Sequence, residues 1–451
     1  MKQLLVMCFV LISTYSTIYA QQSPVLEAYI QAGLASNLAL RQQDLNLQKN
    51  LEALRQAKGL FLPTVQFSAN YTRAVGGRKL DFPIGDLLNP AYATLNQLTQ
   101  SNAFPVLENQ TIQFLPDNFH ETKVKFAYPV FNQDLRLNRA VQEQSLLTTT
   151  AQKAALEHEL RYQITGAYLQ YLQALEAEKV WRGAKTVLGE LLRFNQSLVK
   201  NNVATRDVVA TAEYEISKAD DEIYKLQAAQ NTARAYFNFL INTDLQAEVV
   251  ADTALLRATV PQYERTDLTQ KSLANRHEFE ALRAGISTYE AVIRYNEKSR
   301  TLPDAYVGGE LGWQGFGYKF NGDQAYALVQ AGLTFDIFDG HQLRGKIQQS
   351  KIEREKLNTQ LTDAQRQIQL QVIQASNALD AARHSWETAR TGLAAAEAVF
   401  KIVNNKYRTQ QALLIEYLDA QNRVTTAQLQ VLLAWVEVLA KEAEVRKAAG
   451  L

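Results

Sequence analysis

The hydrophobic and polar positions along this chain follow two periods, one of two residues and one of three to four. The two-residue period occurs in four short stretches. In the first, Val65, Phe67, Ala69 and Tyr71 alternate with polar residues. Such alternation predicts a strand with one apolar and one polar face. The four predicted strands cover residues 63–75, 121–131, 303–315 and 325–338.

The longer period dominates the rest of the chain and predicts long helices. Between Pro129 and Pro261, and again after Pro303, there are no prolines, and the residues are mostly good helix formers. From Val209 to Leu240 apolar residues recur at alternating intervals of three and four, with one polar exception. This spacing is typical of a coiled-coil seam. A helix from 132 to 201 would be about 100 Å long, which suits a tube across a wide space.

The order of predicted elements occurs twice. Leu62-Pro63 and Leu302-Pro303 each end a helix and open a strand, because proline disfavours helical backbone in the residue before it. Phe131-Asn132 and Phe338-Asp339 each end a strand with a residue suited to cap the next helix. We therefore expect two structural repeats on either side of an equatorial linker. The expected divisions are a signal peptide at 1–20, a first repeat at 21–242 with a tip near 201, the linker at 243–266, and a second repeat at 267–451 with a tip near 410.

The N-terminus and the charge limit the classes of function. Lys2, an apolar stretch and a small residue at Ala20 predict a secretory signal peptide cleaved after Ala20, with a short membrane anchor as the alternative. Cys8, the only cysteine, lies inside it, so the mature chain would have no disulfide, thiolate nucleophile or cysteine metal site. The 47 basic and 46 acidic residues leave no basic excess that would indicate nucleic-acid binding.

No arrangement of residues predicts catalysis, a metal or a cofactor. The stretch from Gly340 to Ile347 resembles a phosphate-binding loop, but Ile347 replaces the required hydroxyl and the preceding strand alternates. The five histidines lack ligand spacing. The connection from Gly76 to His120 holds four prolines and is predicted to be a loop, extracellular by topology. We therefore expect a protein that is not an enzyme.

The number of strands predicts association. Four strands cannot close a barrel, for which about eight are needed. Open strand edges within lipid would leave backbone groups unpaired. Three chains would together supply twelve strands. The predicted fold class is mainly α with a membrane β-barrel: a long coiled-coil α-barrel and a trimeric barrel with four strands from each chain.

The chain resembles the TolC-like outer-membrane efflux protein family over almost all of its mature length. The resemblance rests on the duplicated Leu-Pro junctions, on "YPVFNQDLRLNRA" and "FDIFDGHQLRGKI", and on the tip segments "NNVATRDVVATAE" and "YRTQQALLIEYLDAQ". It implies a homotrimer in outer-membrane lipid, extending into the periplasm. It also implies docking on a periplasmic adaptor and an inner-membrane pump, RND-type or ABC-type.

The resemblance also implies site residues at the two tips. Glu416 and Asp419 would line the periplasmic entrance, where threefold symmetry would give two rings of three carboxylates that favour cations. An ordinary exposed acidic pair is the alternative. Gln410 departs from the family, which has a turn glycine there. The expected adaptor contacts are Val203, Ala204, Asp207, Ala412 and Leu413.

Two other classes of protein remain open at this stage. A soluble periplasmic coiled-coil adaptor or structural protein would share the heptads, but would have no use for four membrane-type strands. An exported enzyme would need a site that the sequence does not show. The resemblance favours a passive outer-membrane exit duct of a tripartite efflux or type I secretion system.

Overall fold

The computed structural model describes residues 23–299 and 301–451, so the predicted signal peptide lies outside the described residues. The chain divides into two compact units. The helical unit comprises the described residues up to Leu51, with Gln144–Ser287 and Glu353–Leu451. The sheet unit comprises Glu52–Glu143 and Thr288–Ile352.

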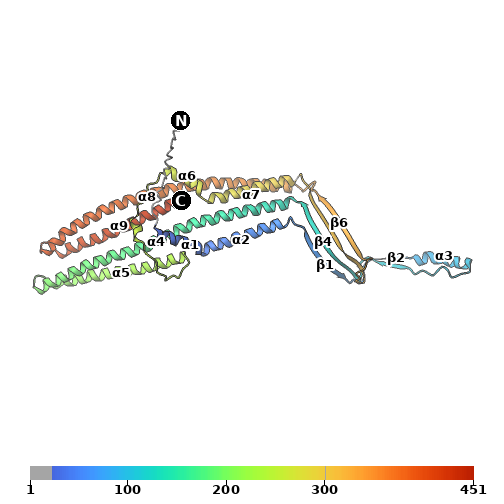
Figure 1. The fold of residues 1–451 in the computed structure, drawn as a ribbon, viewed down its shortest axis with the longest axis horizontal. Coiled ribbons are helices and arrows are strands. Elements are labelled where there is room, and N and C mark those ends of the chain that lie inside the picture. Colours follow the sequence, from blue (N-terminus) through green and yellow to red (C-terminus); the bar gives the residue numbers. More distant parts are fainter. Residues whose placement is uncertain (1–22, 300) are drawn as a thin grey trace, which may run out of the picture. The chain divides into compact units, whose positions relative to one another are not determined.

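Helices and strands alternate in two similar series (Figure 1). The first series is α1 (Pro24–Ser36), α2 (Leu38–Gly59), β1 (Thr64–Thr72), β2 (Lys79–Phe82), α3 (Ile84–Thr99), β3 (Gln110–Gln113), β4 (Phe119–Phe131), α4 (Gln133–Lys200) and α5 (Asp207–Leu240). The second series is α6 (Arg265–Asn275), α7 (Glu278–Ser299), β5 (Asp304–Phe316), β6 (Ala325–Thr334), α8 (Gln342–Arg408) and α9 (Leu414–Ala449). Between them lies an extended segment with one 3-10 turn, η1 (Thr253–Arg257).

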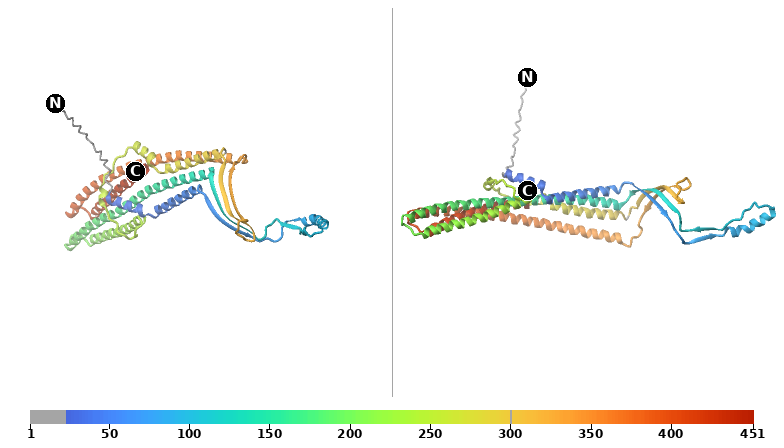
Figure 2. Two further views of the ribbon diagram at one scale, coloured as in Figure 1. Left: turned by 45° about the vertical axis from the view of Figure 1, so that its right-hand side comes forward. Right: turned by 90° about the horizontal axis from the view of Figure 1, so that it is seen from below.

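The helical unit is built from two long hairpins, α4 with α5 and α8 with α9 (Figures 1 and 2). Each hairpin packs against a short helix of its own repeat. Leu26 and Ile30 of α1 join a buried cluster with α4 and α5, and Leu268 of α6 joins one with α8 and α9. The apolar positions of the predicted 209–240 seam are buried or partly buried. The two repeats therefore bury equivalent faces.

The sheet unit holds one four-stranded antiparallel sheet, in the order β1-β4-β5-β6. The observed strands start and end within a few residues of the four predicted ones. Consecutive repeats therefore meet at the centre of the sheet, where β4 pairs with β5. The fold class predicted from the sequence, helical hairpins with four strands per chain, is confirmed.

Short polar caps start the long helices after the strands. The Asn132 side chain accepts a hydrogen bond from the Leu135 N–H at 2.9 Å, and the Asp339 carboxylate accepts one from the Leu343 N–H at 2.7 Å. Gly340 and His341 both have positive φ, 64° and 65°. The resemblance to a phosphate-binding loop is thus a tight turn and a capped helix start.

The prediction of a loop from Gly76 to His120 is wrong in part. Within it, β2 and β3 form a two-stranded antiparallel sheet, and α3 is a helix of 16 residues. Pro90 lies inside α3. The prolines led to the prediction of a loop, but Pro90 is the seventh residue of α3, and the helix lacks only the one N–H···O=C bond that this residue would have donated.

Among the described residues, none of the helices combines the length and the apolar character that a membrane span requires.

Candidate functional site

The register of the four-stranded sheet separates its two faces by polarity. Phe67 is paired with Val124, Val124 with Leu311, and Leu311 with Ala327, so one row across all four strands is apolar. Neighbouring rows on this face add further apolar residues, namely Val65, Phe126, Tyr128, Val307, Trp313, Val329, Ala331 and Leu333. Val329 and Leu333 are 76% and 74% exposed. Thr122 and His120 lie on the same face at one end of β4 and are buried. A face that is otherwise apolar and largely exposed suits hydrocarbon rather than water.

The opposite face is polar and carries an ion-pair network. Lys123 of β4 lies 2.9 Å from the Glu121 carboxylate and 3.0 Å from that of Glu310 on β5. Lys125 lies 3.8 Å from Glu310. Gln66, Ser68 and Asn70 of β1 continue this face. An apolar face backed by a polar one is the pattern of a barrel wall between lipid and water.

Both outer strands of the sheet, β1 and β6, have one unpaired edge. The described residues contain no further strand that could cover either edge. A row of free N–H and C=O groups beside an apolar face is unstable in a membrane unless another strand pairs with it. The sheet of one chain is therefore incomplete as a barrel wall.

The two hairpin tips, in the helical unit, end in the same turn. Asn202 and Gln410 have φ of 60° and 62°. The next N–H in each tip bonds a carbonyl five residues back, from Val203 to Leu198 at 2.9 Å and from Gln411 to Lys406 at 2.7 Å. Gln410 thus occupies the left-handed position at which the resembling family has a turn glycine, at a small conformational cost.

The two acidic residues at the second tip are exposed and engaged locally. The Glu416 carboxylate accepts a hydrogen bond from the Leu413 N–H at 2.9 Å, in the first turn of α9. The Asp419 carboxylate pairs with Arg423, one turn further on, at 2.9 Å. Glu416 and Asp419 lie on one face of α9, and Arg423 partly neutralises the charge of Asp419.

The five residues expected to contact an adaptor lie at the two tips. Val203 and Leu413 are 52% and 67% exposed, and Ala204 and Ala412 are partly exposed. Asp207 is exposed at the first turn of α5, where its carboxylate accepts a hydrogen bond from the Thr205 hydroxyl. Ile415, which the sequence argument did not select, is 67% exposed beside them.

A buried polar link joins the two hairpins near these tips, and the sequence argument missed it. The Asn195 side chain is fully buried on α4 and donates to the Val208 carbonyl at 3.0 Å. Its oxygen accepts a hydrogen bond from the Tyr407 hydroxyl of α8 at 2.7 Å. Burial raises the pKa of Tyr407, so the phenol remains a donor at neutral pH. The only sign of this link in the sequence is that Asn195, a polar residue, occupies a core-facing position of α4.

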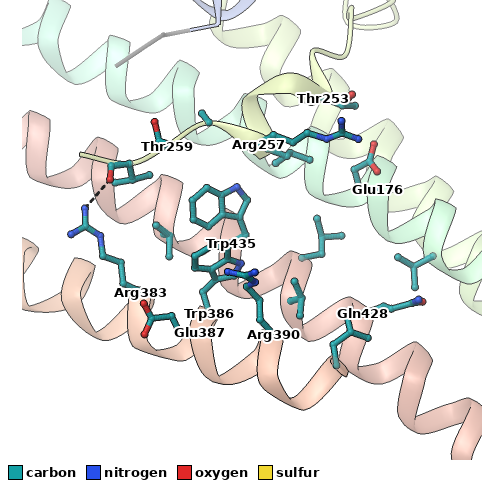
Figure 3. Close-up of a pocket in the computed structure, with 18 of the residues that line it drawn as sticks. Glu176, Thr253, Arg257, Thr259, Arg383, Trp386, Glu387, Arg390, Gln428 and Trp435 are labelled. Atoms are coloured by element: carbon teal, nitrogen blue, oxygen red, sulfur yellow. Dashed lines mark hydrogen bonds between the residues drawn. The ribbon is translucent and has the colours of Figure 1, made fainter. Parts of the chain in front are cut away.

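A pocket of about 1030 Å³ lies in the helical unit between the linker and the helices α4, α8 and α9 (Figure 3). Trp386 and Trp435 are in contact at its centre, with ring centroids 4.4 Å apart and the ring planes tilted by 41°. Arg390 lies over the Trp386 ring at 4.9 Å, and Arg383 donates to the Pro261 carbonyl of the linker. The Arg383 bond holds the linker against α8, and the tryptophan pair joins α8 to α9. None of the lining residues was predicted as a site.

Two histidines that are distant in the sequence lie together in the helical unit. The rings of His158 on α4 and His277, just before α7, have centroids 5.4 Å apart. Burial lowers the pKa of His158, as do the nearby charges of His277, Arg161 and Arg276. Among the described residues, no group of three or more His, Cys, Asp or Glu is placed to hold a metal ion.

Comparisons with known proteins agree with this geometry. Residues 268–451 match the family model for outer membrane efflux proteins. The outer membrane protein VceC from Vibrio cholerae is similar in structure, with a TM-score of 0.73 and 15% identity over 94% of this chain and 96% of that one. The open state of the Neisseria gonorrhoeae MtrE outer membrane channel has a TM-score of 0.73 and 17% identity, over 95% and 89% of the two chains.

The Campylobacter jejuni CmeC outer membrane channel also matches, with a TM-score of 0.73 and 13% identity over 95% and 86% of the two chains. A comparison with curated proteins gives no match. The fold is thus that of the outer-membrane channels. The family model for outer membrane efflux proteins matches residues 268–451, which confirms the resemblance noted in the sequence.

Proposed function

We propose that three copies of this chain form a passive exit channel in the outer membrane, as the outer component of a tripartite efflux or type I secretion system. The observation that carries the proposal is the four-stranded sheet, with its apolar face, its polar face and its two open edges. Three such sheets, joined β1 to β6, make a closed barrel with the polar faces towards the lumen. The similarity in fold to the CmeC and MtrE outer membrane channels supports the same role.

The helical unit would extend this channel into the periplasm. Helices α4 and α8, of 68 and 67 residues, are each about 100 Å long at 1.5 Å per residue. The tips would meet a periplasmic adaptor through Val203, Ala204, Asp207, Ala412 and Leu413, and the pump beyond it would be RND-type or ABC-type. The exposure of these five tip side chains supports a surface for a partner protein.

Membrane extraction and conductance test the channel. The mature protein should need detergent for extraction, migrate as a trimer, and give discrete conductance steps in planar bilayers. A protein that remains soluble and monomeric after lysis without detergent would contradict the proposal. The four-stranded sheet is the feature that a soluble coiled-coil adaptor would lack.

Glu416 and Asp419 are proposed to form cation-favouring rings at the periplasmic entrance. Replacing both with Gln and Asn should lower the preference for cations, measured as a reversal potential in a salt gradient. Arg423→Gln should raise it, because Asp419 loses its ion-pair partner. The control is Asp363→Asn, which changes an exposed acid on a different helix, α8. The same selectivity in all variants would exclude the entrance role.

A further inference from the structure

The insertion between β1 and β4 is an ordered arm of the sheet unit (Figures 1 and 2). After α3 the chain returns along the helix, held by side-chain amides. Asn89 donates to the Leu107 carbonyl at 2.9 Å and accepts from the Leu107 N–H at 2.8 Å. Asn96 bonds the carbonyl and N–H of Phe104 in the same way, at 2.7 and 3.0 Å. Such paired bonds fix the return segment on one face of α3.

A different face of α3 carries a partly exposed apolar row, here termed the α3 seam. Its residues follow intervals of four, three, four and three, namely Ile84, Leu88, Ala91, Leu95 and Leu98. Leu98 is 75% exposed, and Leu88 and Leu95 are each 39% exposed. The intervals are those of a coiled coil over about two heptads. Ile84 is partly buried, whereas Ala91 and Leu98 are exposed, so the row is most open around these two residues.

The charges of α3 favour a protein partner over a lipid surface. Helices that lie on membranes carry Lys or Arg on their polar face. Neither residue occurs in "IGDLLNPAYATLNQLT", the sequence of α3. The one charged residue, Asp86, lies about 160° around the helix from Leu88 by 3.6-residue geometry, so the seam itself is uncharged. Identical copies could therefore meet along it without like-charge repulsion.

The root of the arm favours a copy of this chain as that partner. The arm begins where β1 ends, and β1 is an edge strand of the sheet. Closing the barrel pairs β1 of each copy with β6 of the next, so the three β1 strands lie four strands apart and the roots of the three arms lie around one rim of the barrel. A seam of about two heptads is too short to associate alone. Tethering on one barrel supplies a high effective concentration.

We propose that the α3 seams of three copies pack together as a parallel three-helix cap on the outer side of the barrel. This inference rests on the trimeric channel proposed above. In the cap, Ala91 and Leu95 of each copy face their equivalents in the other two. The occupant of the seam is thus a second and a third copy of the same chain.

Cysteine crosslinking tests the cap, because the chain has no cysteine beyond Cys8 in the predicted signal peptide. Ala91→Cys places a thiol on the seam. Ala93→Cys places one about 200° around the same helix, and both alanines are exposed. A short trifunctional maleimide applied to intact outer membranes should give covalent trimers of Ala91→Cys and almost none of Ala93→Cys. Equal crosslinking of the two variants, or none, would overturn the cap.

A second variant distinguishes failure of the cap from failure of the trimer. Adding Leu95→Glu to Ala91→Cys puts three carboxylates into the seam, so it should abolish the covalent trimer while the detergent-solubilised protein keeps its trimeric mass. Trimeric mass without crosslinks from Ala91→Cys itself would reject the cap and leave the channel standing. A monomeric mass for the unaltered chain would reject both proposals. Undiminished crosslinking in the Leu95→Glu variant would show that the seam does not hold the arms together.

Discussion

The helical unit and the sheet unit use their apolar residues in opposite ways. In the helical unit, Tyr168, Phe237 and Leu268 are fully buried within one chain. In the sheet unit, Val65, Phe67 and Val329 are each more than two thirds exposed although they alternate as regularly as any buried strand. A regular pattern identifies the face that leaves water. It does not identify whether the same chain, another chain or lipid covers that face.

The two units also differ in whether their polar groups find hydrogen-bond partners within the chain. The helical unit satisfies its buried Asn195 from two other helices of the same chain. The sheet leaves the outer edges of β1 and β6 without a partner strand among the residues that the structure describes. The helical hairpins are therefore largely complete in one copy, whereas the barrel wall requires neighbours. Four experiments would test this contrast.

The largest effect is expected in the core of the helical unit. Phe237→Ala removes a ring that packs edge-on against Tyr29 at 5.1 Å, and should cost about 3–5 kcal/mol. Phe239→Ala changes a ring that is 66% exposed on the same helix and should cost within about 0.5 kcal/mol. Thermal loss of helical circular dichroism in detergent measures both. A similar loss at Phe239 would indicate that another copy covers it.

A charge introduced into the four-stranded sheet should destabilise it on the apolar face and be tolerated on the polar face. Val329→Arg places a cation on the apolar face and should cost about 2–4 kcal/mol if the residue lies near the bilayer midplane. Gln330→Arg, the next residue of β6, is on the polar face and should be tolerated. Urea titration of folding into lipid vesicles measures the difference. Equal tolerance of both would contradict the assignment of a lipid face.

A smaller effect is expected at the link between hairpins. Tyr407→Phe removes the donor to the Asn195 oxygen and leaves that buried oxygen unpaired, at a cost of about 1–3 kcal/mol. Tyr417→Phe is the matched control, because Tyr417 packs against Tyr407 at 5.2 Å through its ring. Thermal unfolding, together with protease cleavage at the tips, should distinguish them. Equal stability of both variants would show that the hydrogen bond contributes nothing.

The smallest effect is a pH dependence of the helical unit. Since burial and neighbouring positive charge lower the pKa of His158, the folded state binds its proton less readily than the unfolded state. Stability is therefore highest above the ordinary histidine pKa of about 6.5 and falls as the pH drops from there through the lowered value. His158→Gln should flatten this dependence in melting curves between about pH 7 and pH 5. An unchanged slope would assign the dependence to other groups.

Much of the candidate site could be predicted, because its signals are local. The four strands, the repeats and the tip turn at Asn202 follow from alternation, from Leu-Pro pairs and from the tolerance of asparagine for left-handed backbone. The link from Asn195 to Tyr407 and the contact of His158 with His277 could not be predicted. Each joins residues more than 100 positions apart, and no local pattern marks such a pair.

Outside the segment from Gly76 to His120, the sequence by itself determined which residues form the long helices and the four main strands, and which face of each leaves water, since these depend on short-range periodicity and on proline. Only the tertiary structure decided that the segment after β1 is an ordered arm rather than a loop. There, the side chains of Asn89 and Asn96 bond the backbone of the return segment. It also decided that β4 pairs with β5 at the centre of the sheet, leaving β1 and β6 open. Pairing between strands far apart in the chain depends on register and long-range contact, which no local sequence pattern encodes.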